Sequence, residues 1–262
     1  MKTKLLLFAL SICTITLHAQ TEEDSANEEL AKKAQNPIAN MISVPFQNNT
    51  SYGIGSDGRT SNVLNIQPVI PVGLGEKWNM ITRTIIPIVT VPDFSTTEGS
   101  ITGLGDINLN LFFSPKESKI IWGVGPIFNL PTATDPALGA QEFGIGPAII
   151  LVKMSGKWVY GATMNNTWSV ANSDINRFYL QYFVNYNLPN SWYLSSSPIV
   201  TANWNADSGD QWVVPFGGTV GKIFRIGKLP INAQAGAFYN AVKPDGGADW
   251  QTRFQLQLLF PK

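Results

Sequence analysis

The sequence predicts an all-β fold, a transmembrane antiparallel up-and-down β-barrel of about 12 strands preceded by a short helical segment. Three observations indicate it. Apolar and polar residues alternate along many segments. Short and long connections between these segments also alternate. The tryptophans gather at both ends of the predicted strands.

The alternation is clearest in the last predicted strand. Phe254 and Leu256 fall on one face, whereas Arg253, Gln255 and Gln257 fall on the other, because successive side chains in a strand point to opposite faces. A soluble barrel would turn the apolar face inward, and a membrane barrel would turn it outward to lipid. We interpret Phe254 and Leu256 as facing lipid and the polar set as facing a wet lumen.

The rest of the chain divides into similar segments. The predicted strands are residues 42–52, 62–72, 78–90, 103–113, 120–130, 141–153, 158–169, 177–188, 192–204, 212–224, 229–242 and 250–260. Short connections (73–77, 114–119, 154–157, 189–191 and 225–228) interleave with connections that are mostly longer (53–61, 91–102, 131–140, 170–176, 205–211 and 243–249). Outer-membrane barrels show this asymmetry of short periplasmic turns and longer extracellular loops. An even number of strands places both ends of the barrel domain in the periplasm.

The tryptophans form two predicted aromatic girdles. Trp78, Trp122, Trp158 and Trp192 lie near the short turns, and Trp168, Trp204, Trp212 and Trp250 lie near the long loops. On one strand, Trp158 and Trp168 are separated by roughly 25–30 Å along the barrel axis, the height of the apolar band of an outer membrane. A soluble barrel gives no reason for tryptophan at both rims, so we favour the membrane barrel.

The N-terminus indicates export. Two lysines precede an apolar run from Leu5 to Leu17, which predicts a signal peptide at residues 1–19. Cys13 and His18, the only cysteine and histidine, lie within it. The predicted mature chain then has no disulfide, no thiolate or imidazole metal site, and no Ser-His or Cys-His nucleophile. We expect no enzyme activity, no cofactor, no metal and no nucleic-acid partner, since charged residues make up only 14% of the chain.

Residues 20–40 differ in composition from the barrel at 41–262. They are charged, and Glu28 to Ala34 can form a short helix that Asn36-Pro37 ends. Two interpretations are open, a periplasmic tail or a plug that enters the barrel.

Six prolines conflict with the strand assignment. They are Pro68, Pro87, Pro126, Pro147, Pro198 and Pro215. Proline cannot donate to a ladder and belongs at edges or bulges, and a closed barrel has no edge. We expect either bulges or wrong strand boundaries there.

The polar faces supply candidate lumen-lining residues. These are Arg83, Asp106, Asn108, Asn110, Arg177, Gln181, Asn185, Arg253, Gln255 and Gln257. The row that begins at Asp106 either lines a permeation path or belongs to a salt-bridge network that stiffens the barrel. Aromatic side chains of inward parity (Tyr179, Phe183, Tyr193 and Phe238) either line a pocket or fill the interior.

Two motifs have simpler interpretations. Gly53 to Gly58 matches the letters of a dinucleotide-binding loop, but a strand follows it where that site needs a helix. The loop carboxylates Asp93, Glu98, Asp207, Asp210, Asp245 and Asp249 match no Ca²⁺-binding spacing, so we interpret them as solvated loop residues.

Several blocks of sequence resemble one known family. They are Asn36-Pro37-Ile38-Ala39, residues 43–49, residues 65–71, residues 83–87, Gly103-Leu104-Gly105-Asp106, Ser195-Ser196-Ser197-Pro198, Gly221-Lys222 and residues 259–262. In order and content these resemble the outer-membrane family named for the MetA pathway of phenol degradation, whose members often carry the label "transporter" or, misleadingly, "neuromedin U". The resemblance implies an outer-membrane barrel of a Gram-negative bacterium in which prolines recur. It supplies no substrate and no catalytic residues.

Three functions are compatible with these patterns. The first is a porin-like channel or transporter for small solutes, with small hydrophobic or aromatic compounds among the candidates and a mild anion preference if the inward arginines outnumber Asp106. The second is a closed structural or surface-binding barrel with a filled lumen. The third is a membrane-embedded enzyme acting on lipid, for which the sequence shows no residue cluster. Outer-membrane lipid is the expected partner of the wall, and the sequence does not indicate the oligomeric state.

Overall fold

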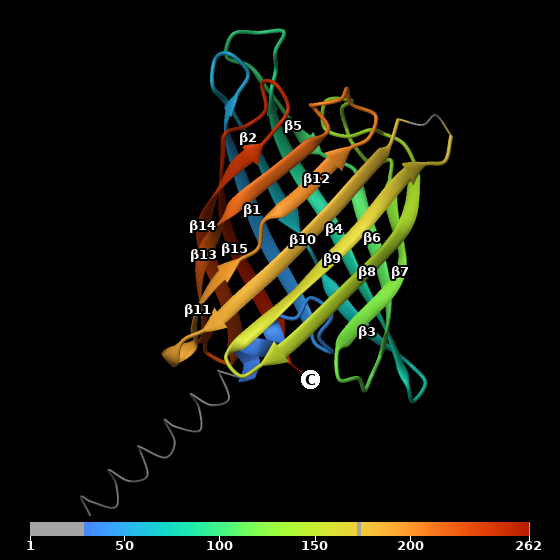
Figure 1. The fold of residues 1–262 in the computed structure, drawn as a ribbon, viewed down its shortest axis with the longest axis vertical. Helices are drawn as coiled ribbons and strands as arrows, with labels where there is room; N and C mark the ends of the chain where they lie inside the picture. Colours follow the sequence, from blue (N-terminus) through green and yellow to red (C-terminus); the bar gives the residue numbers. More distant parts are fainter. Residues whose placement is uncertain (1–28, 172–173, 262) are drawn as a thin grey trace, which may run out of the picture.

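The computed structural model describes residues 29–171 and 174–261, which form a closed antiparallel barrel of 12 spans (Figure 1). The predicted signal peptide (1–19), with Cys13 and His18, lies outside the described residues. The strands are β1 (Ile42–Ile54), β2 (Arg59–Ile66), β3 (Val69–Leu74), β4 (Trp78–Pro92), β5 (Ser100–Leu104), β6 (Ile107–Pro115), β7 (Ile121–Leu130), β8 (Gly144–Ser155), β9 (Trp158–Ser169), β10 (Asn176–Asn187), β11 (Trp192–Ser196), β12 (Ile199–Asn203), β13 (Trp212–Ile226), β14 (Leu229–Val242) and β15 (Trp250–Phe260). A single turn of 3₁₀ helix, η1 (Pro189–Ser191), joins β10 to β11.

Each span pairs with its neighbours in the chain, and β1 pairs with β15 to close the barrel. Three spans consist of two strands each, namely β2 with β3, β5 with β6, and β11 with β12. The turns near the N-terminal segment are short. Two of them have only two residues and place Gly156 and Gly227 at φ of 58° and 59°, a conformation that glycine adopts without strain. No helix among the described residues is long and apolar enough to cross a membrane.

Several loop boundaries differ from the prediction, and two of the differences have a visible cause. The connection expected at 53–61 comprises only residues 55–58, because Tyr52 pairs with Thr60 and Ile54 with Arg59 across a bulge. The strand expected from residue 141 begins at Gly144. The backbone N–H of Gln141 instead donates a hydrogen bond to the side chain of Asp106, the residue before β6.

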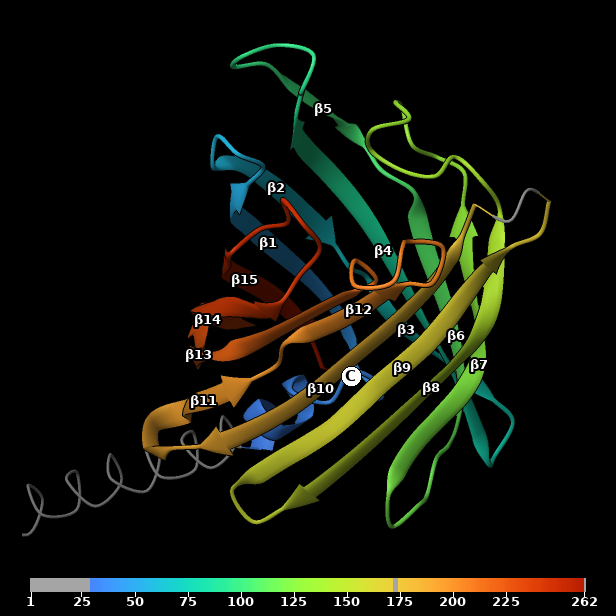
Figure 2. The same ribbon diagram turned by 45° about the horizontal axis from the view of Figure 1, so that its top comes forward.

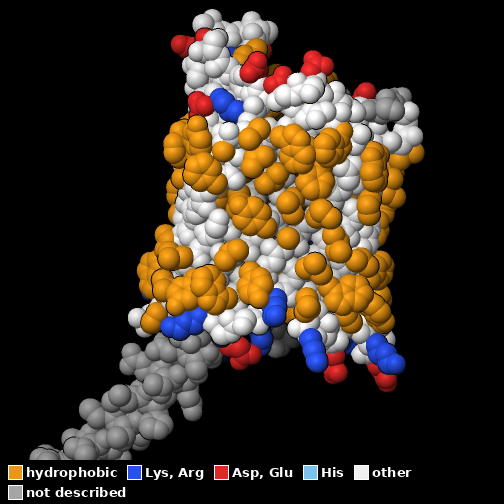
Figure 3. Space-filling model, in the orientation of Figure 1, with side chains coloured by type: hydrophobic (Ala, Val, Ile, Leu, Met, Phe, Trp, Pro, Cys, Tyr) orange, Lys and Arg blue, Asp and Glu red, His pale blue; other side chains and the backbone are white. Residues whose placement is uncertain are grey.

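The outer wall is apolar and carries aromatic side chains at both rims. Figure 3 shows hydrophobic side chains over the wall and charged side chains beyond both ends. Six of the eight tryptophans are exposed, and Trp122 and Trp212 are partly exposed beside Trp78 and Trp204. Phe254, at 58% exposure, faces outward, whereas its neighbour Arg253 is only 1% exposed. The apolar face of the last strand is therefore the outer one.

The in-strand prolines lie where the ladder is interrupted. Pro68 and Pro198 separate β2 from β3 and β11 from β12, and the register continues unchanged across both breaks. Pro215 lies at a bulge opposite β14. Pro126 and Pro147 face each other in register, and ladder pairs are missing on the far side of each. The expectation of bulges is thus confirmed at Pro215 and at Pro87, where the register of β4 shifts by one residue between its pairings with β5 and with β6. At the other four prolines the strands tolerate local gaps.

The glycines beside two of these prolines explain how the gaps close. A Cβ on Gly125 would collide with the backbone oxygen of Leu111, and one on Gly146 would collide with that of Asn166. Neighbouring strands approach these backbones so closely that only glycine fits.

Residues 29–41 lie at the end of the barrel that carries the short turns (Figure 2). Residues 29–34 are helical, as the sequence predicted for this segment. Leu30, Ala31, Ala34 and Met41 pack with Ile223 and Leu259 of the barrel in a buried apolar cluster. Further along, Ile38 joins a second buried cluster with side chains of β3, β4 and β6 to β10. This part of the chain therefore lies against the interior of the barrel.

Candidate functional site: the barrel interior

A chamber of about 760 Å³ occupies the half of the barrel that faces the long loops. Its wall is rich in amides, contributed by Gln47, Asn65, Gln67, Asn108, Asn110, Asn129, Asn165, Gln181, Asn203 and Gln211. Apolar side chains lie between them, among them Ile85, Ile127, Ile175, Tyr179 and Ile199. Ala206, Asp210 and Pro244 from two long loops complete the rim. The chamber can thus hold a small solute against both polar and apolar surfaces.

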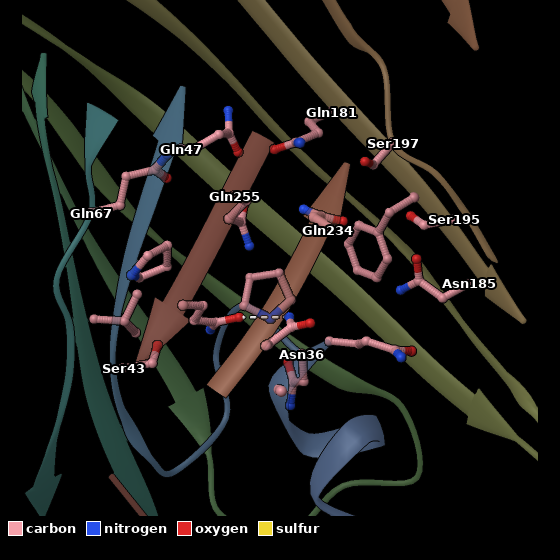
Figure 4. A pocket seen from close by; sticks show the side chains of 18 of the residues that line it. Asn36, Ser43, Gln47, Gln67, Gln181, Asn185, Ser195, Ser197, Gln234 and Gln255 are labelled. Carbon is pink, nitrogen blue, oxygen red and sulfur yellow. Dashed lines mark hydrogen bonds between the residues drawn. The ribbon is translucent and has the colours of Figure 1, made fainter. Parts of the chain in front are cut away.

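A second cavity of about 130 Å³ lies below the chamber (Figure 4). The two share Gln47, Gln67, Arg83 and Gln181, which therefore form a constriction between them. Figure 4 shows the glutamine side chains above this cavity and Asn36 of the N-terminal segment below it. The chamber and the lower cavity therefore adjoin at these four side chains.

The N-terminal segment forms the floor of the lower cavity. Ala34, Gln35, Asn36 and Pro37 all line it. Gln35 exchanges two hydrogen bonds with Asn187 of β10, with Nε2 donating to Oδ1 at 2.9 Å and Nδ2 donating to Oε1 at 3.3 Å. Both amide groups are buried, so this pair fixes the segment to the wall by a contact that water cannot easily replace.

Two arginines face the chamber. Arg177 is the second residue of β10, near the mouth, and its side chain is exposed to the interior space. Arg83 lies deeper, at the constriction, where Nη2 donates to Oε1 of Gln67 at 2.6 Å. The ion pairs within residues 29–171 and 174–261 join Lys33 to Glu29 and Lys243 to Asp249, so neither chamber arginine is neutralised by an acidic side chain of the described chain.

The expected position of Arg253 in a wet lumen is wrong. Its guanidinium is buried and lines neither cavity. Nε donates to Asn49 Oδ1 at 2.9 Å, Nη1 to Ser197 O at 2.7 Å, and Nη2 to Gln251 Oε1 at 3.3 Å, while the guanidinium stacks over Phe238 at 4.5 Å. The break before Pro198 takes Ser197 out of the regular ladder, and Arg253 supplies the donor that its carbonyl needs.

Asp106 performs neither of the two roles considered for it. It lines no cavity and forms no salt bridge. Its carboxylate accepts hydrogen bonds from the backbone amides of Ala133, Ala140 and Gln141 at 3.1, 2.7 and 3.1 Å, and from Asn129 Nδ2 at 3.3 Å. It sits at the break between β5 and β6, where the register to β4 shifts by one residue. Asp106 therefore anchors the long loop 131–143 to the wall.

The interior aromatic side chains divide between the two roles considered. Phe238 is 0% exposed and fills the interior, whereas Phe183 and Tyr193, at most 6% exposed, line the lower cavity. Tyr193 donates to Asn232 Oδ1 at 2.7 Å, and Asn232 donates to Gln257 Oε1 at 3.0 Å. Tyr179 instead lines the chamber.

The other predicted lumen residues lie in the two cavities. Arg83, Asn108, Asn110, Arg177 and Gln181 line the chamber, and Asn185, Gln255 and Gln257 line the lower cavity. Sequence reasoning missed Gln47, Gln67, Asn165 and the other lining amides. Their position on the inward face of the predicted strands was the available signal. It was strong for Gln67, which shares the polar face of its strand with Asn65.

Glu142 is the one buried side chain among the described residues whose polar atoms have no hydrogen-bond partner. Both carboxylate oxygens are buried, although the backbone oxygen of the same residue accepts from Asn129 at 2.8 Å. It does not belong to the lining of either interior cavity.

No protein-family model matches the chain, and no curated protein is significantly similar to it. Among solved structures it is similar to an outer-membrane channel from Pseudomonas putida F1, with a TM-score of 0.63 and 18% identity over 84% of this chain and 94% of that chain. Weaker similarities include the CymD monoaromatic hydrocarbon channel (TM-score 0.47, 8% identity, 88% and 92% covered) and outer membrane phospholipase A from Escherichia coli (0.43, 14%, 84% and 96%). At these identities the likeness shows the fold alone, which is that of an outer-membrane barrel.

Proposed function

We propose that the protein is an outer-membrane channel for small solutes whose periplasmic exit is closed at rest by residues 29–41. The observation that carries the proposal is that the two interior cavities adjoin. The chamber and the lower cavity share four lining residues, and the lower cavity ends on residues 34–37. A solute that enters from the long loops has to pass the four shared side chains and then the N-terminal segment before it reaches the periplasm.

The properties of the segment support a movable closure. It is attached by two apolar clusters and by the Gln35–Asn187 amide pair, and no strand pairing ties residues 29–41 to the wall. These attachments can be released without breaking the barrel ladder. Membership in the phenol-degradation family, and with it the location in the outer membrane of a Gram-negative bacterium, forms part of this proposal and rests on the sequence blocks given above.

The alternative is a closed structural barrel. The buried aromatic side chains and the Arg253 contacts favour it, because they fill part of the interior with fixed structure. The chamber volume favours the channel, since a barrel of purely structural function has no need for an open space lined by free arginines. The amides of the lining favour polar solutes over hydrocarbons.

Reversible cross-linking tests the closure. In the double variant Gln35→Cys/Asn187→Cys, the predicted mature chain has no other cysteine, so a short bifunctional thiol reagent joins only these two positions. We expect single-channel currents in planar bilayers that disappear on bridging and return on reduction. Gln35→Cys alone, treated with the same reagent, is the matched control and keeps its currents.

Removal of residues 21–40 is the complementary measurement. We expect the truncated chain to conduct in a larger fraction of time than the full mature chain. Silence in the full, truncated and reduced proteins, each shown to be folded, would establish the closed barrel and overturn the channel.

A further inference from the structure

We propose that the chamber selectively binds small amphipathic organic anions, a carboxylate joined to an aromatic or branched apolar body. This inference rests on the proposed channel function and deepens it by naming a class of solute. It is carried by the charges, the depth of the two arginines and the composition of the wall between them.

The charge balance of the chamber is positive. Its ionised lining residues are Arg83, Arg177 and Asp210. Asp210 lies in a rim loop, where Oδ1 already accepts the backbone amide of Asp245 at 2.8 Å. Asp106, Glu142 and Asp174, which lie close in the chain to strands of the chamber, are not part of the lining. An anion in the chamber therefore meets two guanidinium groups and one carboxylate that is partly satisfied.

The two arginines stand at different depths. Arg177 is at the mouth, and Arg83 is at the constriction that leads to the lower cavity. Arg83 uses one nitrogen on Gln67, which holds the guanidinium in place and leaves its remaining donors for a ligand. A guanidinium binds a carboxylate with two parallel hydrogen bonds. The arrangement provides one site that captures an anion and a second that receives it.

The wall between them selects for an apolar body. Ile85, Ile127, Ile175 and Ile199 line the same space as the arginines, and Tyr179 adds an aromatic surface. An inorganic anion gains nothing from these side chains, whereas a hydrocarbon gains nothing from the guanidiniums. A molecule that carries both a carboxylate and an apolar group uses the whole chamber.

Binding and permeation together test the inference, with benzoate as the probe and benzamide and benzylamine as size-matched neutral and cationic controls. The binding measurement is saturation-transfer NMR on the folded mature protein in detergent, which requires no open channel. The permeation measurement is the reversal potential in a KCl gradient, together with block of the current by benzoate. We compare the wild type with Arg83→Gln, Arg177→Gln and the double variant. Lys153→Gln, which removes one positive charge outside the chamber, is the matched control.

We expect benzoate to bind at least about tenfold more tightly than benzamide, since hydrogen bonds to a charged group contribute about 1.5–3 kcal/mol, and this preference to disappear in the double variant but not in Lys153→Gln. Equal binding of the three probes, or an unchanged preference in the double variant, would overturn the inference even in a conducting protein. Selective benzoate binding by a protein that never conducts would leave the chamber assignment standing and remove the channel. The two proposals can therefore fail separately.

Discussion

Arg253 permits a sharp test of how the barrel interior is held together. Its guanidinium is 1% exposed, makes hydrogen bonds to Asn49, Ser197 and Gln251, stacks on Phe238, and has no ion-pair partner among the described residues. Two opposing terms decide its contribution. Each hydrogen bond from a charged donor stabilises by about 1.5–3 kcal/mol, whereas burial of an unpaired charge costs several kcal/mol.

We predict that Arg253→Lys destabilises the barrel more than Arg253→Met. Lysine keeps the buried charge but loses the planar fork that reaches Asn49 and Ser197 together, so about 3–5 kcal/mol of stability should be lost. Methionine removes the charge along with its desolvation cost and leaves the acceptors on Asn49, Ser197 and Gln251 without this donor, so the loss should be about 1–3 kcal/mol. A contact that acts through charge alone predicts the reverse order.

Urea unfolding in lipid vesicles, followed by tryptophan fluorescence, measures both losses from the shift of the midpoint at constant slope. Arg177→Met is the matched control, because this arginine is exposed in the chamber, and its effect should remain within about 0.5 kcal/mol. If Arg253→Met lost as much stability as Arg253→Lys, or if both variants matched the control, the view that Arg253 acts through its hydrogen bonds to uncharged acceptors would be refuted.

Other parts of the barrel give three further predictions. Asp106→Asn should speed hydrogen exchange in the loop 131–143 after β7 by about tenfold or more, because a side-chain amide cannot replace a carboxylate that accepts three backbone N–H groups. Unchanged exchange would contradict the role of Asp106 in holding this loop. Hydrogen bonds from the hydroxyl and then the backbone amide of Ser95 lower the pKa of Asp93. The order of its loop should therefore persist below the usual pKa of an Asp side chain and be lost as pH falls through the lowered pKa. NMR titration checks this against Asp93→Asn, which should show no such step. Gly146→Ala should destabilise the barrel by about 1–3 kcal/mol because its Cβ would strike a neighbouring backbone, whereas Gly73→Ala, which has open space, should be nearly neutral in the same urea assay.

The barrel and the orientation of its wall could be predicted because they depend on period-two alternation and on loop length. Phe254 and the tryptophans lie on the outer face, as the alternation and the positions at the strand ends predict. The roles of Asp106 and Arg253 could not be predicted in this way. Inward parity places a side chain inside the barrel, but it does not tell whether the side chain reaches water or a backbone group freed by a break in a distant strand. That distinction depends on contacts between residues far apart in the chain.

The position of the N-terminal segment against the barrel could not be predicted from the sequence pattern of the segment alone. Its apolar residues Leu30 and Ala34 are too few to indicate burial by themselves, and their partners Ile223 and Leu259 are close to the other end of the sequence. The in-strand prolines could be interpreted from the sequence. It predicted either bulges or wrong strand boundaries there, and the structure has bulges at some of these prolines and breaks in the ladder at others.

The distance in sequence between the N-terminal segment and its seat has a consequence for biogenesis. Residues 30–41 pack against side chains of β13 and β15, and β15 is the last strand to be synthesised and the one that closes the barrel on β1. The apolar cover of the segment is therefore complete only when β15 is in place. A chain with a defective closing strand leaves Leu30 and Ala34 without the contact to Leu259.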